Sequence, residues 1–178
     1  MKIKKLLLFI VIAMATAMAA PAQNAEGQQK DLDSLYAQKL LKPGMTAPDF
    51  ILPMVNNYKV QLSEYRGKYV LLDFWASWCP DCRKDIPAVK ELYAKYGAKV
   101  EFIGVSFDTE HERWMKCVTD NGMKWKQVSE LKKMRDAEIA KAYGVQWIPS
   151  MTLIGPDGKV VLSTVVIERM EKALSEIK

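Results

Sequence analysis

Trp78-Cys79-Pro80-Asp81-Cys82 places two cysteines with two residues between them, after an apolar run and before a segment with a helical pattern. This spacing brings the two sulfurs within disulfide reach across one helical turn, and proline suits the first position of a helix. Cys79 would then be the N-cap residue, where unpaired N–H groups and the helix dipole favour negative charge. The motif therefore predicts a redox-active disulfide in which Cys79 attacks and a more buried Cys82 resolves. This chemistry requires no metal and no organic cofactor.

The segments on either side of the motif alternate between strand and helix patterns. Residues 69–75 are nearly continuously apolar, which is typical of a strand buried in a parallel sheet. Residues 80–96 repeat apolar side chains at helical spacing, although Pro87 lies inside them and should kink the helix. Further strands are expected at 50–52, 59–62, 100–107, 125–128, 150–154 and 160–162, and helices at 31–41, 111–121, 136–143 and 167–177. This order predicts an α/β fold with a central mixed sheet flanked by helices.

The N-terminus has the three parts of a secretory signal. Residues 1–5 are basic, residues 6–20 are apolar, and small residues form A-x-A sites at 17–19 and 20–22. The apolar run is shorter than the ~20 residues of a membrane span, which favours cleavage over an uncleaved anchor. We therefore expect a signal peptide over 1–22, a tether or short helix over 23–42 and one domain over 43–178. The mature protein would be periplasmic or otherwise exported.

Charge and cysteine content narrow the function. The formal charge of +5 falls to +2 without the signal, and no dense Lys/Arg run remains, so nucleic acid is not an expected partner. The chain has 3 cysteines, too few for a disulfide framework, so a close pair in an exported domain indicates chemistry. Cys117 is interpreted as a buried, inert thiol. A zinc site that joins it and His111, expected to be solvated, to the pair matches no standard spacing.

Two more residues are candidates for the site. Asp73 ends the apolar run six residues before Cys79. A buried carboxylate has a raised pKa, so Asp73 could accept the proton of Cys82, whereas the alternative is an aspartate that faces solvent. Pro149 precedes an expected strand, and its peptide bond could be cis or trans.

Residues 73–82 resemble the active-site segment of the thioredoxin superfamily. Residues 44–50 (GMTAPDF), 62–67, 144–149 (GVQWIP) and 153–159 (LIGPDGK) narrow the resemblance to the exported TlpA/ResA-like thiol–disulfide oxidoreductases. The match spans roughly residues 43–162. It implies a thioredoxin-like fold with an N-terminal β-hairpin and an extra strand–helix insertion.

The resemblance also implies roles for individual residues. Pro149 would be cis and face Cys79, and the backbone of Ile148 would pair with an extended segment of the client. Asp73 matches the superfamily's buried carboxylate, although many members of this subgroup have Asn there. Asp85 stands where the subgroup often has Glu, so the effect of this shorter acid on the cysteine pair would differ. The expected substrate-binding residues are Trp78, Pro80, Asp81, Ile148 and Pro149.

The function predicted is an oxidoreductase that reduces disulfides of exported proteins, with cytochrome c maturation as one implied setting. Its partners would be protein disulfides or thiols and a membrane-bound electron donor. The charge of Asp81 disfavours a thiolate on Cys79, which predicts a reducing potential. The alternatives are a disulfide oxidase or isomerase and a non-enzymatic peptide-docking module. A peroxidase is disfavoured because Leu72 and Ala76 stand where peroxiredoxins need Pro and Thr/Ser.

Overall fold

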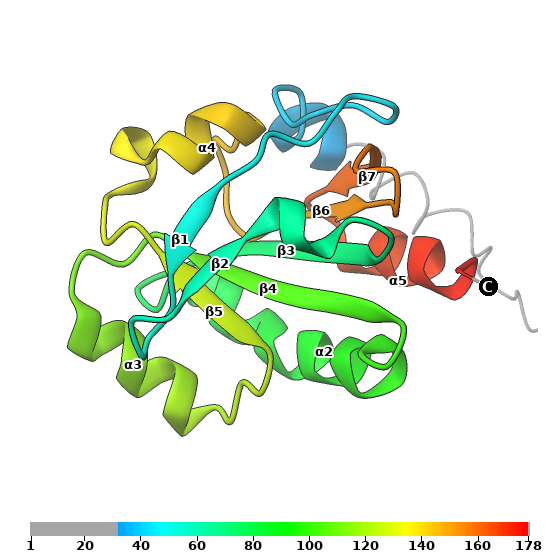
Figure 1. Cartoon of the computed structure of the whole chain (residues 1–178). Helices are drawn as coiled ribbons and strands as arrows, with labels where there is room; N and C mark the ends of the chain where they lie inside the picture. The colour runs from blue at the N-terminus through cyan, green and yellow to red at the C-terminus, as the bar shows by residue number, and fades with distance from the viewer. Residues whose placement is uncertain (1–31, 178) are drawn as a thin grey trace, which may run out of the picture.

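The structure is a computed structural model that describes residues 32–177. Its centre is a five-stranded sheet with the strand order β5-β4-β3-β6-β7 (Figure 1). Strands β3, β4 and β5 are parallel, whereas β6 runs antiparallel to both β3 and β7, so the predicted mixed sheet is confirmed. The bounds are β3 (Tyr69–Trp75), β4 (Val100–Ser106), β5 (Lys126–Ser129), β6 (Ser150–Ile154) and β7 (Val160–Thr164).

The helices largely follow the predicted pattern. Their bounds are α2 (Pro80–Tyr96), α3 (His111–Asp120), α4 (Glu138–Tyr143) and α5 (Ile167–Ser175), with short 3₁₀ turns η1 (Leu62–Tyr65) and η2 (Met134–Asp136). Pro87 lies inside α2 without ending it. The helix expected at 136–143 is divided, because Ala137 has an extended backbone between η2 and α4. The carboxylate of Glu130 accepts hydrogen bonds from the backbone N–H groups of Glu138 and Ile139 and so caps α4 from outside the helix.

A two-stranded hairpin precedes the main sheet. Strands β1 (Ile51–Pro53) and β2 (Lys59–Gln61) are antiparallel, as the sequence predicts. Their turn closes with a hydrogen bond from Met54 N–H to the Tyr58 carbonyl at 2.7 Å, and Asn57 adopts a positive φ of 65°. A bridge between Met54 and Val128 places this hairpin against the edge strand β5.

Strand β3 separates two layers, because successive side chains of a strand point to opposite faces. Leu71 pairs in register with Phe102, whose ring contacts Tyr93 of α2 at 5.4 Å. Phe74 lies on the other face, where its ring is 5.6 Å from that of Tyr143 in α4. Asp73 shares the face of Leu71, so it points into the layer that contains α2.

The segment before the predicted domain packs onto it. Residues 32–36 are helical, and Ala37 and Leu40 are buried in the core. These residues belong to the stretch 23–42 that the sequence assigns to a tether or short helix. Residues 1–31, with the predicted signal peptide, lie outside the described part of the chain. Within residues 32–177, no helix has the length and apolar character needed to cross a membrane.

Candidate active site

Cys79 and Cys82 form a disulfide at the beginning of α2. Cys79 is the N-cap residue, with extended backbone angles, and Pro80 occupies the first helical position as predicted. The backbone N–H of Cys82 donates to the Sγ of Cys79 at 3.1 Å. Cys82 is more buried than Cys79, as predicted, but the difference is small: the exposed fractions are 3 % for Cys82 and 5 % for Cys79. A thiolate on Cys79 would receive this hydrogen bond and the favourable field of the helix N-terminus.

The loop that leads to Cys79 is held by a buried carboxylate that the sequence interpretation missed. Asp108, just after β4, accepts hydrogen bonds from the backbone N–H of Ser77 at 2.9 Å and from its hydroxyl at 2.5 Å. A third hydrogen bond comes from the hydroxyl of Ser106 at 2.7 Å. Because β3 and β4 are parallel neighbours, an acidic residue at the end of β4 lies beside the end of β3. That topological argument could have found Asp108 from the sequence.

Two tryptophans flank this loop in different ways. Trp75 is buried beside the site, and its Nε1 donates to Oε1 of Gln127 at 3.0 Å. The Gln127 side chain crosses Gly104, where a Cβ would lie only 2.2 Å from its Oε1, so a larger residue here would have to displace the amide that Trp75 contacts. Trp78 is 55 % exposed, and its Nε1 lies 3.4 Å from the carbonyl oxygen of Phe107. Trp78 therefore presents an apolar surface next to Cys79.

The loop before β6 also approaches the disulfide. The peptide bond between Ile148 and Pro149 is cis, which agrees with the family resemblance. The carbonyl oxygen of Ile148 lies 3.8 Å from the Sγ of Cys79. Ile148 is buried and Pro149 is half-buried, whereas the neighbouring Trp147 remains 43 % exposed. The structure thus brings together cysteines and loop residues that are about 70 positions apart in the sequence.

Asp73 is buried, so the alternative of a solvent-facing aspartate is wrong. Burial raises its pKa to about 7, and the negative charge of Asp85 adds to this effect. Asp85 is itself half-buried, and its pKa is raised first by burial and then by the charges of Glu168 and Asp81. Asp73 of β3 is therefore a buried carboxyl group whose pKa lies near neutral pH, close to the acidic side chain of Asp85 on α2.

Asp81 and Pro80 are exposed at the start of α2. The carboxylate of Asp81 forms an ion pair with Nζ of Lys84 at 3.0 Å. An exposed pair of this kind is screened by water and salt, so the influence of Asp81 on Cys79 should be modest.

Cys117 and His111, both in α3, differ from their predicted surroundings. Cys117 is half-buried rather than buried, and its pKa is raised by burial and by the charge of Asp108. Its thiolate is therefore disfavoured at neutral pH. His111 is half-buried rather than solvated, and its Nε2 lies 2.9 Å from the carbonyl oxygen of Val55. Between residues 32 and 177, no group of three or more His, Cys, Asp or Glu side chains is arranged to hold a metal ion.

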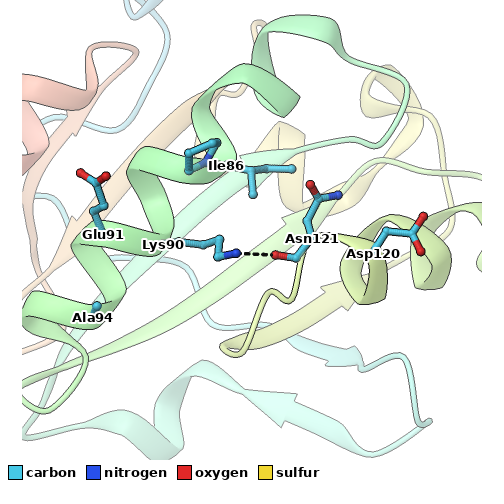
Figure 2. A pocket seen from close by; sticks show the side chains of 7 residues that line it. Ile86, Lys90, Glu91, Ala94, Asp120 and Asn121 are labelled. Carbon is cyan, nitrogen blue, oxygen red and sulfur yellow. Dashed lines mark hydrogen bonds between the residues drawn. The ribbon is translucent and has the colours of Figure 1, made fainter.

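A hollow of about 460 Å³ lies further along α2, between that helix and the end of α3 (Figure 2). The side chain of Lys90 extends across it, and its Nζ donates a hydrogen bond to the carbonyl oxygen of Asn121 at 2.9 Å. None of the predicted site residues lines it. This hollow is separate from the candidate active site.

A thioredoxin-like mixed sheet that carries a CxxC disulfide at a helix start, beside a cis-proline loop, defines a thiol–disulfide oxidoreductase. Residues 43–163 match the AhpC/TSA family, and the chain belongs to this family and to its ResA-like thiol–disulfide oxidoreductases. The matched span agrees with the range expected from the resemblance. The substrates of such an enzyme are thiols and disulfides of proteins.

Proteins similar to this chain are named as thiol–disulfide oxidoreductases or interchange proteins. The thiol-disulfide oxidoreductase ResA of Bacillus thuringiensis subsp. konkukian is 34 % identical over 125 residues, which are 70 % of each chain. ResA of Geobacillus kaustophilus is 33 % identical over 139 residues, 76 % of this chain and 78 % of the relative. A thiol-disulfide oxidoreductase from Bacteroides fragilis superposes with a TM-score of 0.69 at 29 % identity, covering 74 % of this chain and 98 % of that structure. A thiol:disulfide interchange protein from Bacteroides sp. gives 0.67 at 29 % identity, with 78 % and 93 % covered.

Proposed function

We propose that this oxidoreductase works as a reductase of protein disulfides, with Cys79 as the nucleophile and Cys82 as the resolving thiol. The observation that carries the proposal is the position of the Cys79 sulfur. It accepts a hydrogen bond from the backbone N–H of Cys82 and lies beside the Ile148 carbonyl. A helix N-terminus favours the thiolate over the thiol, and only the thiolate attacks a disulfide. The pKa of Cys117 is raised instead, which argues against a redox role for the third cysteine.

The reaction has two exchange steps. The Cys79 thiolate attacks one sulfur of the client disulfide, forms a mixed disulfide and releases the first client thiolate. Cys82 then loses its proton to Asp73, attacks the Cys79 sulfur and releases the second client thiolate. Two electrons pass to the client, and the enzyme is left with the Cys79–Cys82 disulfide. The pKa of about 7 for Asp73 suits a group that accepts a proton at neutral pH and then returns it.

Client binding would use the surface around this sulfur. An extended client segment would pair with the backbone of Ile148, next to Pro149, while the exposed Trp78 and Pro80 supply apolar contact. Asp81 adds a negative charge at the edge of this surface, although Lys84 partly neutralises it.

The setting of the reaction follows from the N-terminal sequence and the resemblance. Residues 1–22 have the pattern of an export signal, so we place the mature protein outside the cytoplasm, in the periplasm or an equivalent compartment. Disulfides persist there, so the Cys79–Cys82 disulfide must be reduced again after each turnover. The resemblance implies that a membrane-bound electron donor supplies these electrons. Apocytochrome c is one client class that the resemblance implies.

The midpoint potential of the Cys79–Cys82 couple tests the direction of the reaction. We expect a value nearer to the ~−270 mV of thioredoxin than to the ~−120 mV of strong disulfide oxidases. Asp81→Asn removes a charge that disfavours the thiolate, so the potential should rise by about 10–20 mV. Asp120→Asn, which breaks a similar exposed pair with Lys116 in α3, is the matched control and should leave the potential unchanged.

A strongly oxidising wild-type potential would assign the protein to the oxidases. If Asp81→Asn shifted the potential no more than Asp120→Asn, the charge argument would be wrong. Redox titration against glutathione and dithiothreitol buffers, with alkylation of free thiols, measures both quantities.

A further inference from the structure

The segment from Asp33 to Leu41, here called the strap, precedes the part of the chain that matches the family and runs beside its active-site end. One end of the strap is fixed to the end of β7. The carboxylate of Asp33 accepts hydrogen bonds from the hydroxyl of Thr164 at 2.8 Å and the backbone N–H of Val165 at 2.9 Å, and it forms an ion pair with Arg169. Because β7 and β6 are antiparallel, the end of β7 lies beside the beginning of β6, where Pro149 is found.

The other end of the strap contacts the connection between α4 and β6. The backbone N–H of Leu41 donates to the carbonyl oxygen of Tyr143 at 3.3 Å. Gly144 ends α4 with a positive φ of 68°, and a Cβ at this position would lie 1.8 Å from the carbonyl oxygen of Lys39. Figure 1 shows the blue N-terminal segment beside the end of α4. This approach of two backbones requires a glycine.

An aromatic stack joins the strap to the active-site loop. The ring of Tyr36 lies on that of Trp147, with centroids 4.3 Å apart and an interplanar angle of 26°. Trp147 directly precedes Ile148, whose carbonyl oxygen is 3.8 Å from the Cys79 sulfur. The strap therefore contacts the α4–β6 connection at two points, at its beginning (Tyr143–Gly144) and near its end (Trp147). The backbone of Ile148 and Pro149, which faces the disulfide, lies between the second of these contacts and β6.

We propose that the strap holds residues 144–149 in the conformation that receives the client, and that Tyr36 is the positioning residue. This inference rests on the proposed function, since it assumes that the client pairs with the Ile148 backbone. A backbone edge that is ordered before binding loses less conformational entropy when a peptide docks on it. Tyr36 acts through Trp147 and touches neither sulfur. Its effect should therefore fall on the binding of peptide clients and spare the thiol chemistry itself.

The test compares Tyr36→Ala, Tyr36→Phe and the control Tyr58→Ala, which removes an exposed tyrosine ring from the β1–β2 turn. With a peptide disulfide as substrate, Tyr36→Ala should lower kcat/KM about fivefold through a higher KM. Tyr36→Phe keeps the stack and should stay within about twofold of wild type, as should Tyr58→Ala. The rate with the small disulfide 5,5′-dithiobis(2-nitrobenzoate) and the midpoint potential should be unchanged in all three.

Hydrogen exchange supplies a readout that does not depend on turnover. Amides of residues 144–148 and 150 should exchange about five times faster in Tyr36→Ala than in wild type or Tyr36→Phe, with no change in α2. Unchanged exchange and unchanged peptide KM would overturn the positioning role. An equal loss with the small disulfide would also overturn it, because the chemistry would then be affected. A wild-type protein without turnover would refute the proposed function, and hydrogen exchange would still decide whether Tyr36 orders the loop.

Discussion

Cys82→Ala is expected to stop the reaction half-way, with the client held on Cys79 as a mixed disulfide. The Cys79 thiolate would still attack, because its hydrogen bond comes from the backbone N–H of residue 82 and survives the substitution. No second thiol would be near enough to resolve the intermediate, since Cys117 lies in α3 and has a raised pKa. Turnover of insulin disulfides should fall more than about a hundredfold, to the uncatalysed exchange. Non-reducing electrophoresis and mass spectrometry would identify the bound client.

Two variants complete this experiment. Cys79→Ser should lose turnover to the same extent but form no mixed disulfide, whereas Cys117→Ser should behave as wild type. A peptide-docking module without catalysis would instead bind clients equally well in all variants and show no dependence on Cys79. Mixed disulfides on Cys117 would show that the third cysteine takes part, contrary to the roles proposed above.

Asp73→Asn is expected to stabilise the oxidised protein at alkaline pH and to slow the resolving step. The folded state raises the pKa of Asp73 from 3.8 to about 7, so it holds a proton that the unfolded state has already lost. The free energy of unfolding therefore decreases as the pH rises from about 4 to about 7, and the full cost is present above that range. Asparagine removes this cost, so the variant should gain on the order of 2–4 kcal/mol at pH 8 and nothing near pH 4.

Urea denaturation of the oxidised wild type and variant between pH 4 and pH 9 measures this difference, with Asp81→Asn as an exposed control. Loss of the proton acceptor should also reduce the rate of resolution roughly 100-fold or more near neutral pH. A stability difference that does not depend on pH would mean that Asp73 is not the group that titrates near 7. An unchanged resolution rate would remove Asp73 from the mechanism.

Local patterns in the sequence predict the strand and the helix that position the candidate site. Residues 69–75 and 80–96 have the predicted strand and helix bounds, because a buried strand and a proline-started helix leave clear signals. Asp73 lies inside the core, as its position in the apolar run predicts. The cis state of the Ile148–Pro149 bond required the family resemblance, since both isomers fit the local sequence.

Other features depend on contacts between distant residues and leave no local pattern. The division of the helix expected at 136–143 follows from the cap that Glu130 places on α4, eight residues before the first N–H that it receives. The stack of Tyr36 on Trp147 joins residues 111 positions apart. The helical spacing around Cys117 predicts that it is buried, but periodicity alone cannot locate the edge of a buried face, and this thiol is half-buried.

Alkylation of the reduced protein shows which sulfur is ionised, because iodoacetamide reacts with the thiolate and not with the thiol. Reduced wild type would be treated with a limiting amount of iodoacetamide at pH 7, and the modified cysteines would be mapped by mass spectrometry at successive times. The thiolate at the start of α2 should make Cys79 the first to react, followed by Cys82 and Cys117. Modification of Cys117 first, with Cys79 left unlabelled, would contradict the assignment of Cys79 as the attacking sulfur.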